Sequence, residues 1–157
     1  MIEPSSSYIS AITLDESGIA KRTTVLEHER NVAMNDLIVW NHFVVKELAG
    51  PYRLTLSTSE NRMTFNVQSD AGQTAQLIAI PLGPFRSTFR DYMLICESYF
   101  EAVKTGNLPK IEAIDMSRRG LHNEGADLLS TLLADKIEMD YETSRRLFTL
   151  LHVLHLR

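Results

Sequence analysis

The sequence predicts an α+β domain in which helices pack mainly on one face of an antiparallel, three- to four-stranded sheet. Segments in the first half alternate apolar and polar residues, which is the period of a half-buried strand. Longer segments repeat apolar residues every three to four positions, as amphipathic helices do. A chain of 157 residues with 44% hydrophobic and 23% charged side chains has the size and composition of one globular domain. We expect a single domain over residues 1–157, with four to five helices in the order β-α-β-β-β-α-α-α.

The first strand and the first helix occupy the N-terminal third of the chain. YISAITL (8–14) alternates well enough to form a short strand. Apolar residues at helical spacing then run from Leu26 through Trp40 to Leu48. This spacing predicts one long helix, ended by Gly50-Pro51 because neither residue continues a helix readily.

Three further strands are expected to form an antiparallel meander. They are YRLTLS (52–57), RMTFNV (62–67) and TAQLIAIPL (74–82), and turn-rich segments connect them. The first two each place apolar side chains on one face and polar side chains on the other. A sheet with one polar face implies that the helices cover a single side.

The second half is expected to be helical. Gly83-Pro84 suits a helix start, and an apolar stripe runs from Phe85 to Val103 before a stop at Gly106. Another helix begins at Pro109. The last helix is capped by Asp140, and its second half is apolar nearly all round, which predicts a central buried helix.

Composition excludes several classes of protein. The net charge is −4 and no segment forms a basic stripe, so we expect no nucleic-acid partner. The single cysteine, Cys96, excludes an internal disulfide and a four-thiolate zinc site. Glycine-rich phosphate loops and nucleophile elbows are absent, and we expect no cofactor. The start of the chain lacks the features of a signal peptide, and no apolar stretch reaches membrane-spanning length, so we expect a cytoplasmic protein without a membrane partner.

The histidines do not form a metal site by spacing. EHERN (27–31) begins like a zinc-binding helix motif, but Val32 stands where the second histidine ligand belongs. His152 and His155 are three residues apart, yet no acid or thiol lies within a turn to complete a ligand set. We therefore predict no metal, and we interpret these histidines as structural.

The stretch IDMSRRGLHNEG (114–125) is the strongest candidate for a functional site. In one helix over 109–133, Gly120 and Gly125 would each cost about 1 kcal/mol relative to alanine. A break avoids that cost: one helix ends at Gly120 in a left-handed cap, and Asn123 caps the next. A helix N-terminus of this kind binds anions.

Three hypotheses follow from this stretch. The leading one is a small binding or interaction protein, a homo-oligomer, that recognises a phosphate- or carboxylate-bearing ligand or partner. In the second, an enzyme uses His122 as general acid/base, poised by Asp115 or Glu124, with Arg118 and Arg119 as oxyanion stabilisers. We rank the enzyme lower because no nucleophile accompanies the histidine. In the third, the charges form an ion-pair network at an oligomer interface. The expected ligand-binding residues are Arg118, Arg119, His122, Asn123, Arg145 and Arg146.

The chain also resembles a known protein family. The resemblance rests on LEHERNVA, GPYRLTLS with ENRMTFNV, PFRSTFRDYMLICESYFEAV, IEAIDMSRRGLHNEGADLL and IEMDYETSRRLFTLLHVLHLR, which cover most of the chain from residue 26 onward. These segments are similar to an uncharacterised alphaproteobacterial family, number 0262 of the UPF series. The resemblance implies a bacterial cytoplasmic protein that acts as a stand-alone domain, and it implies no activity or catalytic residues.

Overall fold

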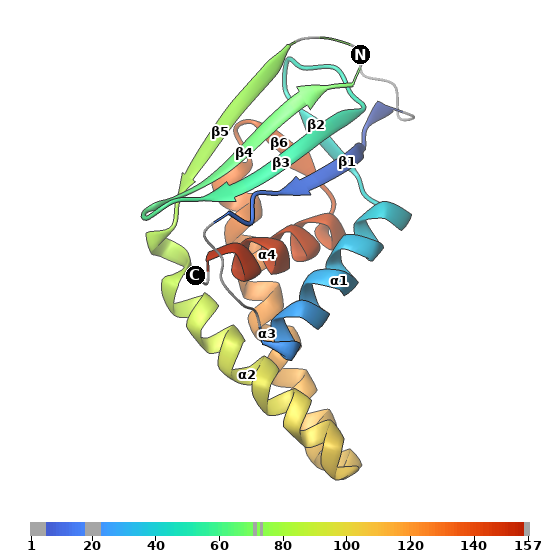
Figure 1. Cartoon of the computed structure of the whole chain (residues 1–157), viewed down its shortest axis with the longest axis vertical. Coiled ribbons are helices and arrows are strands. Elements are labelled where there is room, and N and C mark those ends of the chain that lie inside the picture. The colour runs from blue at the N-terminus through green and yellow to red at the C-terminus, as the bar shows by residue number, and fades with distance from the viewer. Residues whose placement is uncertain (1–5, 18–22, 71, 73, 156–157) are drawn as a thin grey trace.

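The computed structural model is a mixed α+β fold, and it describes residues 6–17, 23–70, 72 and 74–155 (Figure 1). This part of the chain contains a four-stranded sheet, a two-stranded sheet and four α-helices. In chain order the elements are β1 (Ile9–Leu14), α1 (Thr24–Val39), β2 (Phe43–Val45), β3 (Tyr52–Thr58), β4 (Arg62–Ser69), β5 (Ala75–Pro81), the short 3-10 helix η2 (Gly83–Phe85), α2 (Arg86–Thr105), α3 (Leu108–Leu133), β6 (Ile137–Met139) and α4 (Tyr141–His155).

The main sheet has the strand order β1-β3-β4-β5. The meander β3-β4-β5 is antiparallel, as its alternating sequence predicts. The prediction of a purely antiparallel sheet is wrong, however, because β1 lies parallel to β3. The physical reason is the connection between the two strands. Because helix α1 returns the chain to the end of the sheet at which β1 begins, the next strand of this sheet, β3, runs in the same direction as β1.

The first helix ends earlier than its apolar spacing predicts. α1 stops at Val39, and Trp40 already has an extended backbone (φ −156°, ψ 133°). The side chain of Asn41 donates to the Leu37 carbonyl and so replaces the backbone group that would continue the helix. The following residues form β2, which pairs with β6 in a two-stranded sheet that the sequence did not reveal. β2 consists of Phe43 and two valines, aromatic and β-branched residues that favour a strand, although they also fall at helical spacing.

Helix α3 is continuous, so the predicted break at Gly120 is wrong. Asn107 caps its start by accepting a hydrogen bond from the Lys110 N–H, which leaves Asn123 in the helix interior rather than at an N-terminus. The second glycine of the stretch has a packing role. A Cβ at Gly125 would overlap the ring of Phe148 on α4, so only glycine lets the two helices cross this closely.

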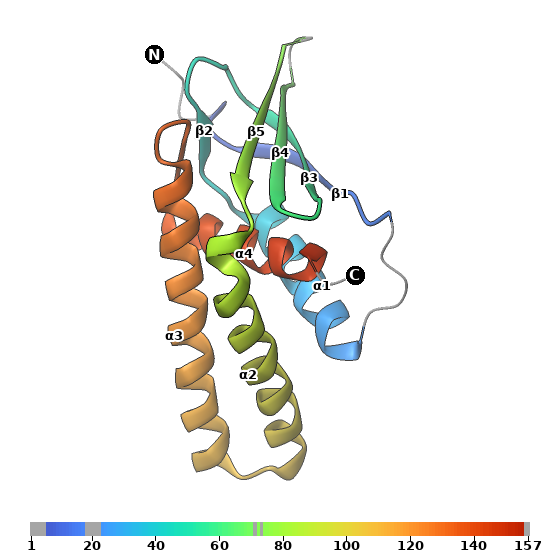
Figure 2. The same ribbon diagram turned by 90° about the vertical axis from the view of Figure 1, so that its left-hand side faces the viewer.

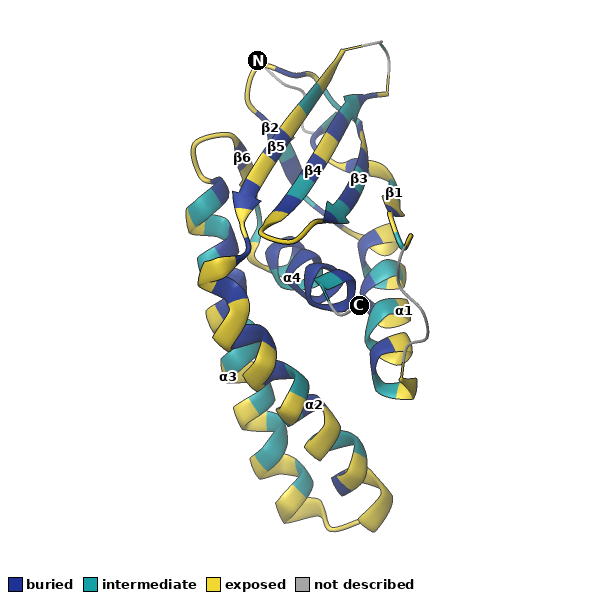
Figure 3. Ribbon diagram, turned by 60° about the vertical axis from the view of Figure 1, so that its left-hand side comes forward, coloured by how far each residue is buried: buried dark blue, intermediate teal, exposed yellow. Residues whose placement is uncertain are grey.

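Helix α4 is the centre of the core, as predicted. It lies under one face of the main sheet, and the other three helices pack around it on that side (Figures 1 and 2). Figure 3 shows the second half of α4 buried nearly all round. Residues 147–154 are all buried, and the ring of Phe148 contacts Phe85 and Phe89 at the start of α2. The sheet's other face is polar or exposed, for example at Arg53 and Asn66.

The distal parts of α2 and α3 extend away from the sheet as a helical hairpin (Figure 2). Gly106 ends α2, as predicted, and it adopts the left-handed conformation (φ 69°). The buried face of α2 changes near the end of the helix. Val103 is exposed, contrary to the prediction, and Ala102 is buried instead. The reason is that α3, rather than the central core, is the packing partner of this part of α2.

The two glycines of α3 should respond to alanine in opposite ways. Gly125→Ala should lower the free energy of unfolding by about 1–3 kcal/mol, because the new methyl group overlaps the Phe148 ring. Gly120→Ala should raise it by about 0.5–1 kcal/mol, because that position is helical and its Cβ would meet no neighbouring atom. Urea denaturation of both variants tests this pair. Equal effects would contradict the close crossing of α3 and α4.

Candidate functional site

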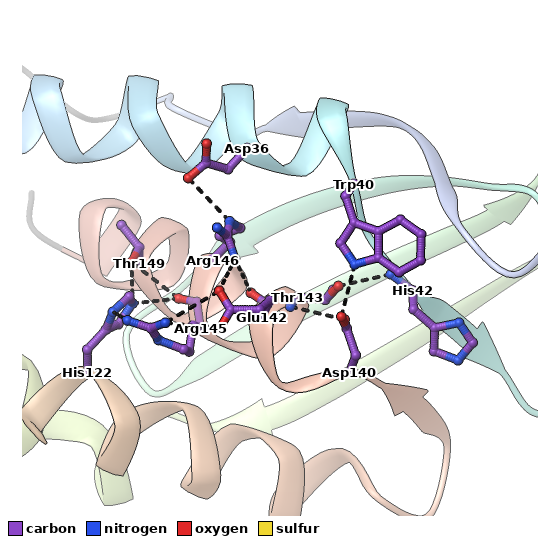
Figure 4. Close-up of polar contacts among 10 residues, drawn as sticks. All are labelled: Asp36, Trp40, His42, His122, Asp140, Glu142, Thr143, Arg145, Arg146 and Thr149. Atoms are coloured by element: carbon purple, nitrogen blue, oxygen red, sulfur yellow. Dashed lines mark hydrogen bonds and ion pairs between the residues drawn. The ribbon is translucent and has the colours of Figure 1, made fainter. Parts of the chain in front are cut away.

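The candidate site is a small pocket between α1, α3 and α4, with Tyr92 of α2 in its wall. Its volume is about 130 Å³. Its lining combines ionisable, polar and apolar side chains from four helices. These are Glu29, Val32, Ala33, Asp36, Tyr92, Arg118, His122, Glu142, Arg145, Arg146 and Thr149. Figure 4 shows how the polar side chains of α4 point from that helix toward α1 and α3.

Four of the six expected site residues line this pocket. Arg118 and His122 come from α3, and Arg145 and Arg146 come from α4. Arg119 and Asn123 do not line the pocket. The Arg119 side chain is 57% exposed and forms an ion pair with Asp115. The continuous helix explains this separation, because residues four apart share a face whereas the next residue is rotated away by about 100°.

Carboxylates contact every arginine of the pocket. Arg146 lies between two of them, with Nη1 2.6 Å from Glu142 Oε2 and Nε 3.3 Å from Asp36 Oδ2 (Figure 4). Arg145 uses Nη1 to donate to Glu142 Oε1 at 3.1 Å. These hydrogen bonds, chiefly the one from Arg146, lower the pKa of Glu142. The carboxylate is therefore charged and shared by two guanidinium groups.

The third arginine, Arg118, is paired outside the pocket lining. Its Nη2 donates to Asp115 Oδ1 at 2.7 Å, and its guanidinium group lies 4.7 Å from the centre of the Tyr99 ring. Burial opposes its charge, but the hydrogen bond to Asp115 and nearby acids raise its pKa overall. The lining holds three carboxylates and three guanidinium groups, and Asp115, beside Arg118, adds a fourth carboxylate. It is a site of mixed charge and not a purely cationic one.

His122 is held as a neutral ring. Its Nδ1 lies 3.4 Å from Arg145 Nη2, which can only donate, so Nδ1 is the acceptor and Nε2 carries the proton. Nε2 lies 2.8 Å from both the Arg145 carbonyl and the Thr149 hydroxyl oxygen. Burial lowers the pKa of His122 to about 4, and the charge of Arg145 acts in the same direction. The ring stacks on Tyr92, with 5.3 Å between centres.

A third acidic residue, Glu29 of α1, also lines the pocket. Its Oε1 accepts a hydrogen bond from the Tyr92 hydroxyl at 2.7 Å and lies 3.8 Å from Cys96 Sγ. Burial, together with the charge of Glu29, raises the pKa of Cys96 to about 12. The thiol is therefore un-ionised, and Cys96 belongs to the buried core.

Sequence reasoning missed the contribution of α1 to this site. Glu29, Asp36 and the apolar Ala33 between them recur at helical spacing, so they share the face that meets α4. Two acidic residues on a partly apolar helix face were the one indication in the sequence that α1 contributes to a polar site. Nothing in the sequence placed them near arginines more than 100 residues away.

The N-terminus of α4 is anchored beside the pocket by a separate set of hydrogen bonds (Figure 4). Asp140 accepts from the Thr143 N–H, as the predicted cap, and also from Trp40 Nε1 at 3.1 Å. The Thr143 hydroxyl oxygen accepts from the His42 N–H at 3.0 Å. These contacts fix α4 against the end of α1, and so they fix the two walls of the pocket relative to each other.

Two kinds of feature are absent from the described ranges. No three His, Cys, Asp or Glu side chains there are grouped closely enough to hold a metal ion. Within the same residues, no helix has the length and apolar character needed to cross a membrane.

Comparison with known proteins gives a family and close relatives. The model of a family described as "Uncharacterised protein family (UPF0262)" matches residues 6–157. A UPF0262 protein of Rhodospirillum rubrum is 48% identical over 146 residues, which cover 93% of this chain and 91% of the relative. One from Brucella anthropi is 49% identical over 148 residues (93% and 92%), and one from Methylobacterium radiotolerans is 43% identical over 147 residues (94% and 92%). No solved structure gives a significant match.

The neutral state of His122 predicts a loss of stability in mild acid. In the unfolded chain this ring takes up a proton near pH 6.5, whereas in the fold its pKa is about 4. Between these values the unfolded state binds a proton that the folded state does not, so the free energy of unfolding falls as the pH falls. The slope is at most about 1.4 kcal/mol per pH unit for one ring.

Urea denaturation at a series of pH values measures this slope. His122→Gln should reduce it, because the amide cannot titrate. Asn123→Gln, one position along the same helix, should keep the slope of the unmodified protein. Identical slopes for all three proteins would show that His122 is not held neutral by the fold.

Proposed function

The chain belongs to the UPF0262 family, and we propose that it is a binding protein whose pocket between α1, α3 and α4 takes a small ligand with a carboxylate and a positively charged group. The sequence led us to expect an anionic ligand. The mixed charge of the pocket refines that expectation to a dipolar one, such as a small amino acid. In this proposal Arg145 and Arg146 receive the carboxylate, and Glu29 receives the cationic group.

One observation carries the proposal: Arg145 has a donor that the fold leaves unused. Its Nε is buried and makes no hydrogen bond within the described residues, although both terminal nitrogens of the same guanidinium group are engaged. A buried donor without a partner costs about 1–3 kcal/mol. Because the Arg145 side chain lines the pocket, a shift of its guanidinium group would let a ligand carboxylate accept from Nε. A charge-assisted hydrogen bond of this kind is among the stronger ones in proteins.

The wall formed by α1 favours a cationic group of the ligand. Glu29 uses Oε1 to accept from Tyr92, and its second oxygen makes no hydrogen bond in the part of the chain that the structure describes. Glu29 has no ion pair with an arginine there either. The charge of Glu29 helps to raise the pKa of Arg118. A bare anion in the pocket would still be repelled by the Glu29 carboxylate, whereas a ligand ammonium group would be attracted to it.

The size of the pocket limits the ligand. At about 130 Å³ it lies below the roughly 300–1,000 Å³ of sites for drug-sized molecules. A ligand of about five non-hydrogen atoms binds with at most about −1.5 kcal/mol per atom, which corresponds to micromolar dissociation constants or weaker. Binding should therefore be sought at high ligand concentrations.

The geometry supports the enzyme hypothesis less well. A general acid at neutral pH needs a proton that it can release, but His122 is neutral there and its pKa is about 4. Both ring nitrogens are engaged by Arg145 and Thr149. Asp115, expected to orient the ring, is instead paired with Arg118 and Arg119.

A structural role is the second candidate, and the pairing of every pocket arginine with a carboxylate favours it. In that case the network joins α1, α3 and α4 without binding anything. The two candidates differ in one respect: a ligand stabilises the protein only if the pocket binds it.

Glycine and L-alanine are the probes for the binding proposal, with acetate, methylammonium and inorganic phosphate for comparison. We expect the two amino acids to raise the melting temperature and to give heat of binding in calorimetry. The single-charge probes should give smaller effects. Arg145→Gln should abolish binding, because it removes the unused Nε donor.

Arg119→Gln is the matched control, because this arginine comes from the same cluster but lies outside the pocket lining. It should bind both amino acids as the unmodified protein does. No binding by any probe, together with a lower stability of Arg145→Gln, would overturn the proposal in favour of the structural network. Stronger binding of phosphate than of glycine would overturn the dipolar ligand.

A further inference from the structure

We propose that the free edge of β1 is the contact between two copies of this chain, joined by antiparallel pairing of their β1 strands. The pairing would extend the main sheets of the two copies into one continuous sheet. This inference is independent of the pocket and its ligand, because it rests on a different face of the molecule.

Among the described residues, β1 pairs on one side only, and its register against β3 shifts between Ile9 and Ala11. β1 is at the end of the sheet order, so β3 is its one strand neighbour in the described residues. The side chain of Asn41 covers the first residue only: it accepts from the Ile9 N–H at 2.7 Å and donates to the Ile9 carbonyl at 3.1 Å. No other group outside β3 hydrogen-bonds the β1 backbone among the residues that the structure describes. An open edge of this kind is a template for another strand.

An apolar ridge stands beside this edge. Ile38, Val39 and Trp40, at the end of α1, are 76%, 85% and 61% exposed, and Tyr8 at the start of β1 is 39% exposed. The ridge and the strand form the two sides of a groove of about 460 Å³, lined by residues 7–12 and 37–42. Clusters of exposed large apolar side chains are rare on monomers and mark contact surfaces.

Charge selects a second copy as the occupant. Edge strands that stay free usually carry charged side chains, often lysine, which prevent pairing. Residues 8–14 carry no charged side chain, and the groove lining contains none except the titratable His42. The net charge of −4 opposes self-association, and a contact face without charges adds no close like-charge pairs to that repulsion. The uncharged strand of one copy matches the uncharged groove of the other.

The geometry of antiparallel pairing is self-complementary. A contact with two-fold symmetry uses the same surface patch on both partners, and two identical strands satisfy this when they run in opposite directions. In that arrangement the ridge of each copy meets the β1 strand of the other. Backbone hydrogen bonds and apolar contacts would then form together in one interface.

The mass in solution tests the proposal first. Light scattering on the full chain should give twice the monomer mass of 17.8 kDa. Val39→Lys should give the monomer mass while the subunit still unfolds cooperatively, because Val39 is 85% exposed and contributes little to the fold. Its melting temperature should fall only by the stabilisation that dimerisation provides. Leu77→Lys, at an exposed apolar position on β5, is the matched control and should remain a dimer.

Cysteine cross-linking tests whether β1 lies at the contact. In separate variants, Ala11→Cys, Ile12→Cys and Thr13→Cys place a thiol along β1, whereas the native Cys96 is buried. At least one variant should form a covalent dimer on mild oxidation, and the unmodified chain should form none. A monomeric unmodified chain would overturn the proposal. So would a dimer that Val39→Lys leaves intact and that none of the three thiols cross-links, because its interface would lie elsewhere.

Discussion

The burial of α4 is the constraint on which the rest of the structure depends. Its second half presents apolar side chains in every direction, and residues 147–154 are all buried. Each large side chain removed from water contributes about 1.5–3 kcal/mol, so this helix needs neighbours on all sides. The main sheet covers it from one side, and α1, α2 and α3 surround the remainder (Figure 1). Position 125 requires glycine because α3 approaches the Phe148 ring of α4 closely there.

The candidate site follows from the same helix. The first half of α4 is polar, and it emerges from the apolar core between α1 and α3 with Arg145 and Arg146 on its surface. Their charges are partly removed from water, so they require carboxylates, and Glu142 and Asp36 provide them. Within the described residues, Nε of Arg145 and one oxygen of Glu29 make no hydrogen bond, and both residues line the pocket. These polar atoms without hydrogen-bond partners distinguish the proposed binding site from a completed ion-pair network.

Local patterns predicted the elements whose neighbours are close in sequence. The meander β3-β4-β5, the cap at Asp140 and the central burial of α4 all follow from alternation or helical spacing. The predictions are wrong where contacts between residues distant in sequence determine the local structure. Asn41 ends α1 by hydrogen-bonding Leu37 and Ile9, and Gly125 stays inside a helix because of Phe148. The candidate site shows the same difference between local and distant contacts. The cluster around Arg118 and His122 was visible in the sequence, but the continuous helix α3 places Arg119 and Asn123 outside the pocket. The acids of α1 become neighbours of this cluster only through the fold.

The most direct test of the central proposal observes the unused donor itself. The Nε–H groups of buried arginines can be followed in a proton–nitrogen correlation spectrum while glycine is added. We predict that the Arg145 resonance, assigned by its loss in Arg145→Gln, shifts and saturates, whereas the Arg119 resonance stays in place. An Arg145 Nε–H resonance that does not move up to the solubility limit of glycine would contradict a carboxylate site at this pocket.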